Sequence, residues 1–152
     1  MRNRISGGAG NEQLRGRDGN DTLYGDNRTA SAIGGSDILI GGAGKGSLTG
    51  GAGNDIFRFM AASDSVVGAN ADIITDFDDA GDDRIDVSAL FGPAITYRHS
   101  AAFTAAGQVR INDIAGVDLI VQVNTGGTLA ADVEIRLSNT TLASMAASDF
   151  VL

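Results

Sequence analysis

The chain has 152 residues, no cysteine and a formal net charge of −8. This length suffices for one domain with its own core, and the charge argues against nucleic acid as a partner. Without cysteine there is no disulfide, so stability outside the cell needs another source, of which a bound metal ion is one. No apolar run reaches the roughly 18 residues of a membrane-spanning helix.

The first 58 residues are organised in units of nine. Residues 25–40 fit the same register if 28–34 is an insertion, and residues 2–6 are the back half of one more unit. The chain thus starts in mid-unit, and we expect further repeats or another domain upstream. The complete units read GGAGNEQLR (7–15), GRDGNDTLY (16–24), GGAGKGSLT (41–49) and GGAGNDIFR (50–58).

Each unit predicts a tight turn followed by a short strand. Glycines at the first, second and fourth places permit positive φ and close backbone approach, so the turn points carbonyl oxygens inward. The eighth place is always apolar, and stacked units bury these side chains as a continuous ladder. A flexible glycine-rich linker, the alternative, has no reason to keep this period. The ladder consists of Ile5, Leu14, Leu23, Leu39, Leu48 and Phe57.

The sixth place adds a carboxylate, which makes the turn a candidate calcium site. Ca²⁺ takes about 6–8 oxygen ligands, and the pattern G-G-x-G-x-D-x-U-x, with U apolar, matches the calcium-binding repeat of RTX proteins. The acids of the chain are almost all aspartate, with glutamate only at Glu12 and Glu134. For Asp18 and Asp26, a ligand role and an ordinary turn role are both open.

The acid place is filled unevenly. If two units make one turn of the roll, alternate units stack on the same edge. One edge then holds Asn3, Asp21 and Gly46, and the other holds Glu12, Asp37 and Asp55. We expect the best site where Asp37 and Asp55 are neighbours, and a weaker one between Asp21 and Gly46.

Beyond residue 58 the period stops and ordinary strands are predicted. Residues 71–77 alternate apolar and polar side chains, and 84–90 reads as a strand that runs into a helical turn. Residues 108–114 and 117–124 read as a hairpin, followed by a strand at 133–137.

These residues resemble the C-terminal calcium-binding domain of serralysin-type secreted metalloproteases (peptidase M10). The resemblance is carried by the repeats and by DIFRF (55–59), SDS (63–65), ADIITDF (71–77), GDDRIDVSAL (81–90) and DFVL (149–152). The chain is also similar to the R-modules of mannuronan C-5-epimerases. The resemblance implies an all-β fold: a parallel β-roll of RTX repeats over 1–58, truncated at its N-terminal side, and a β-sandwich-like cap over 59–152 that packs with the roll as one module.

The resemblance also implies several Ca²⁺ ions, each between two turns of one edge. One turn gives places two, four and six, and the next gives places one, three and six. The first site would use Asp26, Gly35 and Asp37 with Gly50, Ala52 and Asp55. The second would use Gly8, Gly10 and Glu12 with Gly25, Asn27 and Asp37. The third would use Gly19 and Asp21 with Gly41 and Ala43. In the last turn, Gly51, Gly53 and Asp55 would be completed by Asp72, with Asp76 as second candidate; the alternative for Asp72 is a solvent-facing strand acid.

Export is implied by the same resemblance. Such proteins leave Gram-negative bacteria unfolded, through type I secretion machinery that reads an uncleaved C-terminal signal. The sequence shows no N-terminal signal peptide, which agrees with this route. The candidate signal is Asp149, Phe150, Val151 and Leu152, and the alternative is an ordinary last strand.

The leading prediction is therefore a non-catalytic, secreted, extracellular module. It would fold on binding Ca²⁺ and stabilise an upstream catalytic domain. The single histidine, His99, excludes the H-E-x-x-H zinc site of a protease within this chain. The alternative is a module that binds an acidic polysaccharide such as alginate. Arginines near the N-terminus favour it, and the net charge argues against it unless Ca²⁺ neutralises the acids.

Overall fold

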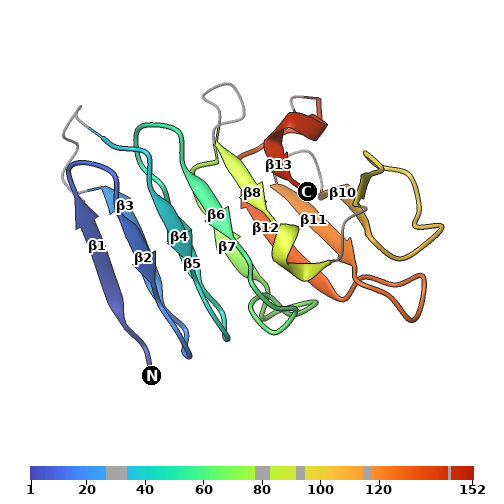
Figure 1. Ribbon diagram of the computed structural model, residues 1–152, viewed down its shortest axis with the longest axis horizontal. Coiled ribbons are helices and arrows are strands. Elements are labelled where there is room, and N and C mark those ends of the chain that lie inside the picture. The colour runs from blue at the N-terminus through green and yellow to red at the C-terminus, as the bar shows by residue number, and fades with distance from the viewer. Residues whose placement is uncertain (27–33, 78–82, 92–94, 115–117, 144) are drawn as a thin grey trace.

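The computed structural model describes residues 1–26, 34–77, 83–91, 95–114, 118–143 and 145–152, and nearly all of its regular structure is β-strand (Figure 1). Two short 3₁₀-helices, η1 (Ser88–Leu90) and η2 (Ala147–Asp149), are the exceptions among these residues. The strands are β1 (Arg4–Gly8), β2 (Gln13–Arg15), β3 (Thr22–Asp26), β4 (Ile38–Ile40), β5 (Ser47–Thr49), β6 (Ile56–Arg58), β7 (Asp72–Ile74), β8 (Arg84–Asp86), β9 (Thr96–Tyr97), β10 (Gln108–Ile114), β11 (Asp118–Asn124), β12 (Val133–Ser138) and β13 (Phe150–Val151).

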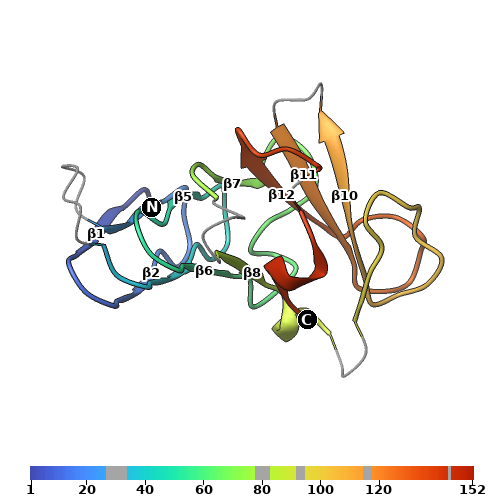
Figure 2. The same cartoon turned by 90° about the horizontal axis from the view of Figure 1, so that it is seen from above.

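The strands form two facing sheets. The large sheet has the order β1-β3-β5-β7-β12-β11-β10-β9, and the small sheet has the order β13-β8-β6-β4-β2. Successive strands of the repeats alternate between the sheets, and the repeat strands that are neighbours within a sheet pair in parallel. Seen from above, the two layers of the roll lie over each other, with the longer strands of the cap at one end (Figure 2). The expected parallel β-roll with a β-sandwich-like cap is confirmed.

The apolar ladder follows the predicted nine-residue period. In the large sheet Ile5 pairs with Leu23, and Leu23 with Leu48. In the small sheet Leu14 pairs with Leu39, and Leu39 with Phe57. Each ladder gains one further member beyond the repeats, because Leu48 pairs with Ile74 and Phe57 with Ile85. The parallel stacking of the roll thus continues past residue 58, into β7 and β8.

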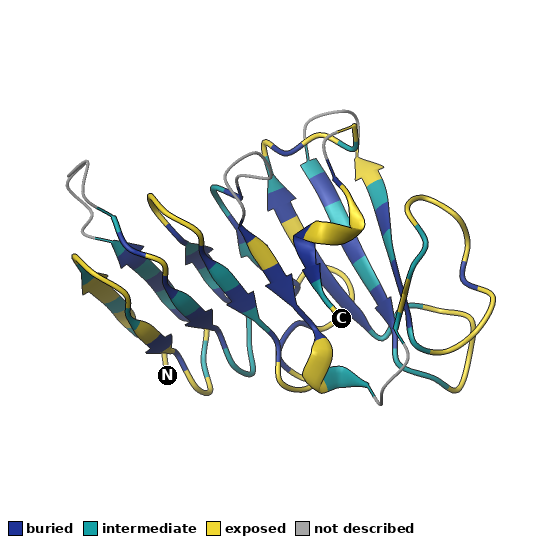
Figure 3. Cartoon of the chain, turned by 45° about the horizontal axis from the view of Figure 1, so that its top comes forward, coloured by how far each residue is buried: buried dark blue, intermediate teal, exposed yellow. Residues whose placement is uncertain are grey.

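The cap joins the roll through one strand of each sheet. In the large sheet β12 pairs in parallel with β7 and antiparallel with β11, and the predicted hairpin is formed by β10 and β11. In the small sheet β13 pairs in parallel with β8. The inward side chains of roll and cap belong to one cluster of buried residues. Figure 3 colours buried positions dark blue, and these occur in the strands of both parts. This continuous core holds the turns of the roll in fixed register.

A matched pair of leucine substitutions tests the ladder. Leu39 is fully buried, whereas Leu129 is 64% exposed. With Ca²⁺ in excess, Leu39→Ala is expected to lower the free energy of unfolding by about 2–5 kcal/mol, because it removes packed apolar atoms and leaves a cavity. Leu129→Ala should change it by about 0.5 kcal/mol or less. Urea unfolding followed by circular dichroism measures both, and equal midpoints would contradict the assigned register.

Candidate metal sites between stacked turns

The turns of the roll lie on two edges, as the alternation of units predicts. On each edge, the carbonyl oxygen at the acid place accepts a hydrogen bond from the residue that follows the acid place of the next turn. On one edge these bonds join Thr22 to Asn3, Ser47 to Asp21 and Ile73 to Gly46; on the other they join Ile38 to Glu12, Ile56 to Asp37 and Arg84 to Asp55. The acid places therefore form two straight columns along the roll.

One oxygen of each aspartate in these columns is bonded to the preceding turn. The backbone N–H of Glu12 donates to Asp37 Oδ1, and that of Asp37 donates to Asp55 Oδ1, both at 2.8 Å. Asp55 N–H donates in the same way to Asp83 Oδ1 at 2.9 Å. On the other edge Asn3 N–H donates to Asp21 Oδ1 at 2.6 Å. This bond fixes each carboxylate in a single orientation.

The second oxygen of the carboxylates points away from any donor. Five such oxygens are buried and have no hydrogen-bond partner within the part of the chain that the structure describes: Glu12 Oε2, Asp21 Oδ2, Asp37 Oδ2, Asp55 Oδ2 and Asp72 Oδ2. An unpaired polar group that is removed from water costs roughly 1–3 kcal/mol, and more if it is charged. Their repetition along both edges indicates that something else satisfies them.

The glycine at place one leaves room beside each of these oxygens. A Cβ atom on Gly25 would lie 2.2 Å from Asp37 Oδ2 and 2.3 Å from the carbonyl oxygen of Gly50. Carboxylate and carbonyl oxygens thus converge on a space that only glycine keeps open. Oxygen donors of these two kinds are the ligands that Ca²⁺ takes in proteins, so the residues fit this ion.

The electrostatics of the columns are unfavourable without a cation. Burial, with repulsion from Asp83, Asp37 and Asp76, raises the pKa of Asp55 to about 7, although the Asp37 N–H bond opposes the shift. Burial also raises the pKa of Asp72 to about 7. The pKa values of Glu12 and Asp37 are raised in the same way, first by burial. These four carboxyl groups therefore favour a bound proton or a bound cation over a bare carboxylate.

The first predicted site is brought together around the turn at 50–52. Asp26 Oδ1 accepts from Gly35 N–H at 3.3 Å, and its Oδ2 accepts from Ala52 N–H at 2.7 Å. Asp26 therefore ties the two turns together through its side chain. Gly50 lies beside the Asp55 carboxylate, as expected.

The second and third predicted sites are brought together in part. Gly10 and Gly35 are in close backbone contact, and Gly25 lies beside Gly7 and Asp37. Gly8 pairs with Asp26 across β1 and β3, whereas Asn27 is outside the described residues. In the third site the carbonyl of Ala43 accepts from Gly19 N–H at 2.8 Å, and the Gly41 carbonyl lies beside Gly16 and Asp21.

The expected position of Asp72 is wrong. Asp72 Oδ1 accepts from Gly46 N–H at 2.6 Å, and a Cβ on Gly41 would lie 2.7 Å from its Oδ2. Asp72 thus continues the edge of Asp21 and Gly46, because β7 follows β5 in the large sheet. It is also fully buried, which excludes the solvent-facing alternative.

The last turn is completed by other acids. Asp83 takes the place beside Asp55, and Asp76 accepts from Gly50 N–H and Gly51 N–H, both at 2.9 Å. Asp83 was missed as a site residue, although the sequence carries a signal for it. Asp72-Ile73-Ile74 and Asp83-Arg84-Ile85 both keep the D-x-U ending of the repeat.

In the described ranges there is no group of three or more His, Cys, Asp or Glu side chains around one point, which is consistent with turns that rely on carbonyl oxygens. His99 is exposed and lies beside Ser100. None of the helices in the described part is long and apolar enough to cross a membrane.

The C-terminal residues are built into the fold. Asp149 Oδ2 accepts from Ala146 N–H at 2.7 Å, and the ring of Phe150 is buried 5.2 Å from that of Tyr97. Val151 pairs with Asp86 in the small sheet, and Leu152 is exposed at the end. The segment proposed as a signal is thus also the last strand.

Comparison with known proteins agrees with this geometry. The profile of the family described as peptidase M10 serralysin C terminal matches residues 3–152. No curated protein sequence matches at a significant level. The structure is similar to the solution structure of the AlgE6R3 subunit of a mannuronan C5-epimerase from Azotobacter vinelandii, with 31% identity, a TM-score of 0.70, and coverage of 99% of this chain and 78% of that one. It is also similar to the AlgE6R2 subunit of the A. vinelandii enzyme, with 30% identity, a TM-score of 0.60, and coverage of 97% and 91%. The chain belongs to the peptidase M10 serralysin C-terminal family.

Proposed function

We propose that this chain is a non-catalytic module that binds several Ca²⁺ ions and folds when it does so. The observation that carries the proposal is the column of buried, unpartnered carboxylate oxygens beside the carbonyls of the next turn. Ca²⁺ would supply the positive charge that these oxygens need. The chain itself contributes the spacing, through glycine turns and the apolar ladder.

Calcium binding and folding are coupled in this proposal. In the unfolded chain the acids are far apart and hydrated, whereas the roll places them in columns. Without the ion, desolvation and mutual repulsion oppose the fold. With the ion, the free energy of binding becomes free energy of folding. The columns of Glu12, Asp37, Asp55 and Asp83 on one edge, and of Asp21 and Asp72 on the other, would hold the ions.

The coupling suits a secreted protein. Extracellular calcium modules work at about 10⁻⁴–10⁻³ M, far above the calcium level of a bacterial cytosol. We therefore place the module outside a Gram-negative cell, exported unfolded by type I secretion machinery and attached to an upstream catalytic domain. The family description, a serralysin C terminus, and the epimerase subunits both support a module within a longer enzyme.

A calcium titration tests the proposal. The chelated chain is expected to gain β-sheet signal in far-UV circular dichroism cooperatively as Ca²⁺ is added. Asp55→Asn keeps the shape of the side chain but removes its charge, and it should raise the calcium midpoint by about tenfold. The matched control is Asp113→Asn, at an exposed position near the end of β10. A β signal that is already complete in chelator would contradict calcium-driven folding.

The pH dependence provides a separate test. The folded-state pKa values of Asp55 and Asp72 are raised to about 7, above the unfolded value of about 3.9. Protonation of these two groups therefore stabilises the calcium-free fold fully below about pH 4, and this contribution is lost as pH rises through about 7.

In chelator, the chain should thus show less β-sheet signal in far-UV circular dichroism at pH 8 than at pH 5. In Ca²⁺ the trend should reverse, because the ion binds deprotonated carboxylates. The double variant Asp55→Asn/Asp72→Asn should lose most of the dependence. A calcium-free chain that is more stable at pH 8 would rule out the electrostatic argument.

A second candidate function is binding of an acidic polysaccharide on the outer face of the large sheet. One hollow there is lined by Arg2, Arg4 and Tyr24, and the next along the sheet by Arg2 and Lys45. The Arg4 guanidinium lies 5.3 Å from the centre of the Tyr24 ring. Two structural neighbours are subunits of an enzyme named for mannuronan. Cations beside an aromatic ring are a suitable surface for an anionic sugar.

Retention on an immobilised polyuronate, with Ca²⁺ saturating, tests this candidate. Arg4→Gln should shorten retention, whereas Arg84→Gln, at an exposed position on the opposite sheet, should not. Retention that is unchanged in both variants, or absent in the parent chain, would eliminate this surface.

A further inference from the structure

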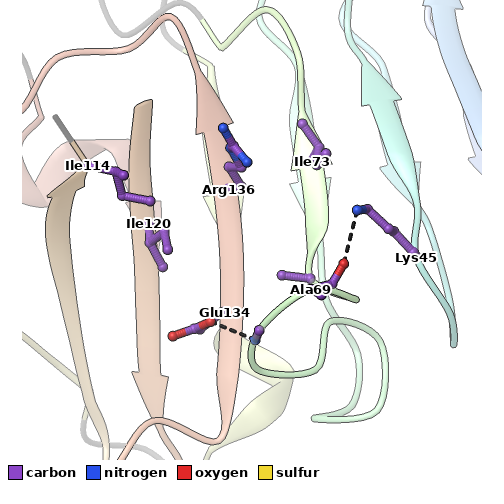
Figure 4. Close-up of a pocket in the computed structure, with 9 residues that line it drawn as sticks. Lys45, Ala69, Ile73, Ile114, Ile120, Glu134 and Arg136 are labelled. Atoms are coloured by element: carbon purple, nitrogen blue, oxygen red, sulfur yellow. Dashed lines mark hydrogen bonds between the residues drawn. The ribbon is translucent and has the colours of Figure 1, made fainter. Parts of the chain in front are cut away.

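We infer that the outer face of the large sheet carries a separate binding site for a small carboxylate with an apolar body. The site is a hollow of about 350 Å³ where the roll meets the cap, over β7, β12 and β11 (Figure 4). It differs in character from the two arginine-lined hollows of the roll, because most of its lining is apolar. Ligand sites in proteins are typically concave, largely apolar and provided with a few polar groups.

The floor of the hollow has one outward isoleucine on each side of Arg136. Ile73 and Ile120 both pair with Arg136, one from each side, so the three residues form a row across the strands. The next members of this row are Ser47 beside Ile73 and Asn112 beside Ile120. Apolar side chains on the outward face of a sheet expose apolar surface to water. Covering that apolar surface with a ligand is favourable.

A third isoleucine extends the floor. Ile114 lies at the end of β10 and is 40% exposed. Together with Ala69 and Ala71 from the loop before β7, it extends the apolar lining of the hollow from the roll to the cap. The space corresponds to on the order of ten non-hydrogen atoms, if each takes about 30 Å³ as a liquid water molecule does.

The charged group at the roll end is Lys45. Its Nζ donates to the carbonyl oxygen of Ala69 at 3.0 Å, and the ion pairs of the described residues do not include it. It is the only lysine of the chain, and it stands in a unit that reads KG where two other units read ND. An ammonium group with a neutral partner, at one end of an apolar floor, is complementary to a carboxylate head.

The other charged groups of the hollow are already engaged. The Nε of Arg136 donates to Asp118 Oδ2 at 2.9 Å, which holds the guanidinium beside the floor. Glu134 accepts from Gly68 N–H at 2.8 Å and from Gln122 Nε2 at 2.5 Å. Figure 4 shows Glu134 and Lys45 on opposite sides of the hollow, so the acid does not neutralise the ammonium group. The geometry therefore selects one orientation, with the ligand's carboxylate at Lys45 and its alkyl chain over Ile73 and Ile120.

A sugar acid would fit this hollow poorly. Its hydroxyl groups would lie against isoleucine side chains and lose hydrogen bonds to water without replacement. A straight-chain carboxylate such as hexanoate fits better, because it has a charged head for Lys45 and an apolar chain for the isoleucines. It can be titrated into a solution that contains Ca²⁺. The hollow thus differs in its chemistry from the polysaccharide surface, although the two share Lys45 and Ile73.

The test is an NMR titration of the ¹⁵N-labelled chain in excess Ca²⁺ with sodium hexanoate. Saturable shifts are expected at residues 45, 69, 73, 120 and 136, with a Kd of about millimolar for a ligand of this size. Acetate, which lacks the chain, and 1-hexanol, which lacks the charge, should each bind at least about fivefold more weakly. Lys45→Gln should weaken hexanoate by about fivefold, while Arg15→Gln, exposed on β2, should leave it unchanged.

The outcomes separate the alternatives. Equal shifts with acetate and hexanoate would reduce the site to simple charge attraction, and equal binding of hexanol and hexanoate would remove the role of Lys45; either result overturns the inference. Tighter binding of glucuronate than of hexanoate would also overturn it, in favour of the polysaccharide surface.

A variant of the floor adds a second test. Ile73→Thr keeps the β-branched shape and should weaken the binding of hexanoate, while the remaining spectrum stays that of a folded chain. Absence of saturable shifts in the parent chain would refute the site.

Discussion

Everything in the roll depends on the stacking of like charges. Most layers bring another carboxylate to one of the two edges, in register with its neighbours, and five of these carboxylates keep one oxygen without a donor among the described residues. An apolar ladder alone would hold such short strands together only weakly, since each contributes a single inward side chain. The apolar ladder therefore determines the geometry of the roll. In the function proposed above, neutralisation of the carboxylate columns by a cation determines whether that geometry is stable.

This division of roles explains what the sequence could predict. The ladder from Ile5 to Phe57 and the alternation of edges both follow from a nine-residue period, which is local information. The period fails after residue 58 because the connections before β7 and β8 are longer than a repeat turn. The register of Asp72 then depends on which sheet the chain enters, and only the D-x-U ending of the repeat survives as a signal. The same three-residue pattern also occurs at residues 64–66, 118–120 and 149–151, so by itself it does not place Asp72 and Asp83.

The strands of the cap could be predicted from the sequence, but their arrangement in the sheets could not. The hairpin of β10 and β11 is a local feature, whereas the parallel pairing of β12 with β7 joins segments some sixty residues apart. The hollow at this junction is likewise formed by segments that are far apart in the sequence. Lys45, Ile73 and Ile120 come from three such stretches. Surfaces that are assembled across a sheet in this way are visible only once the strand order is known.

The strand order also gives the module a direction. At one end, β12 and β13 cover the last strands of the two ladders; at the other, β1 and β2 are the outermost strands. A layer in the middle of the roll is held from both sides. At the cap end, β12 and β13 give the two ladders a finished edge, so this end should serve as the template on which each further layer of the roll forms. The module is in effect a stack of strand layers that is covered at one end by the cap.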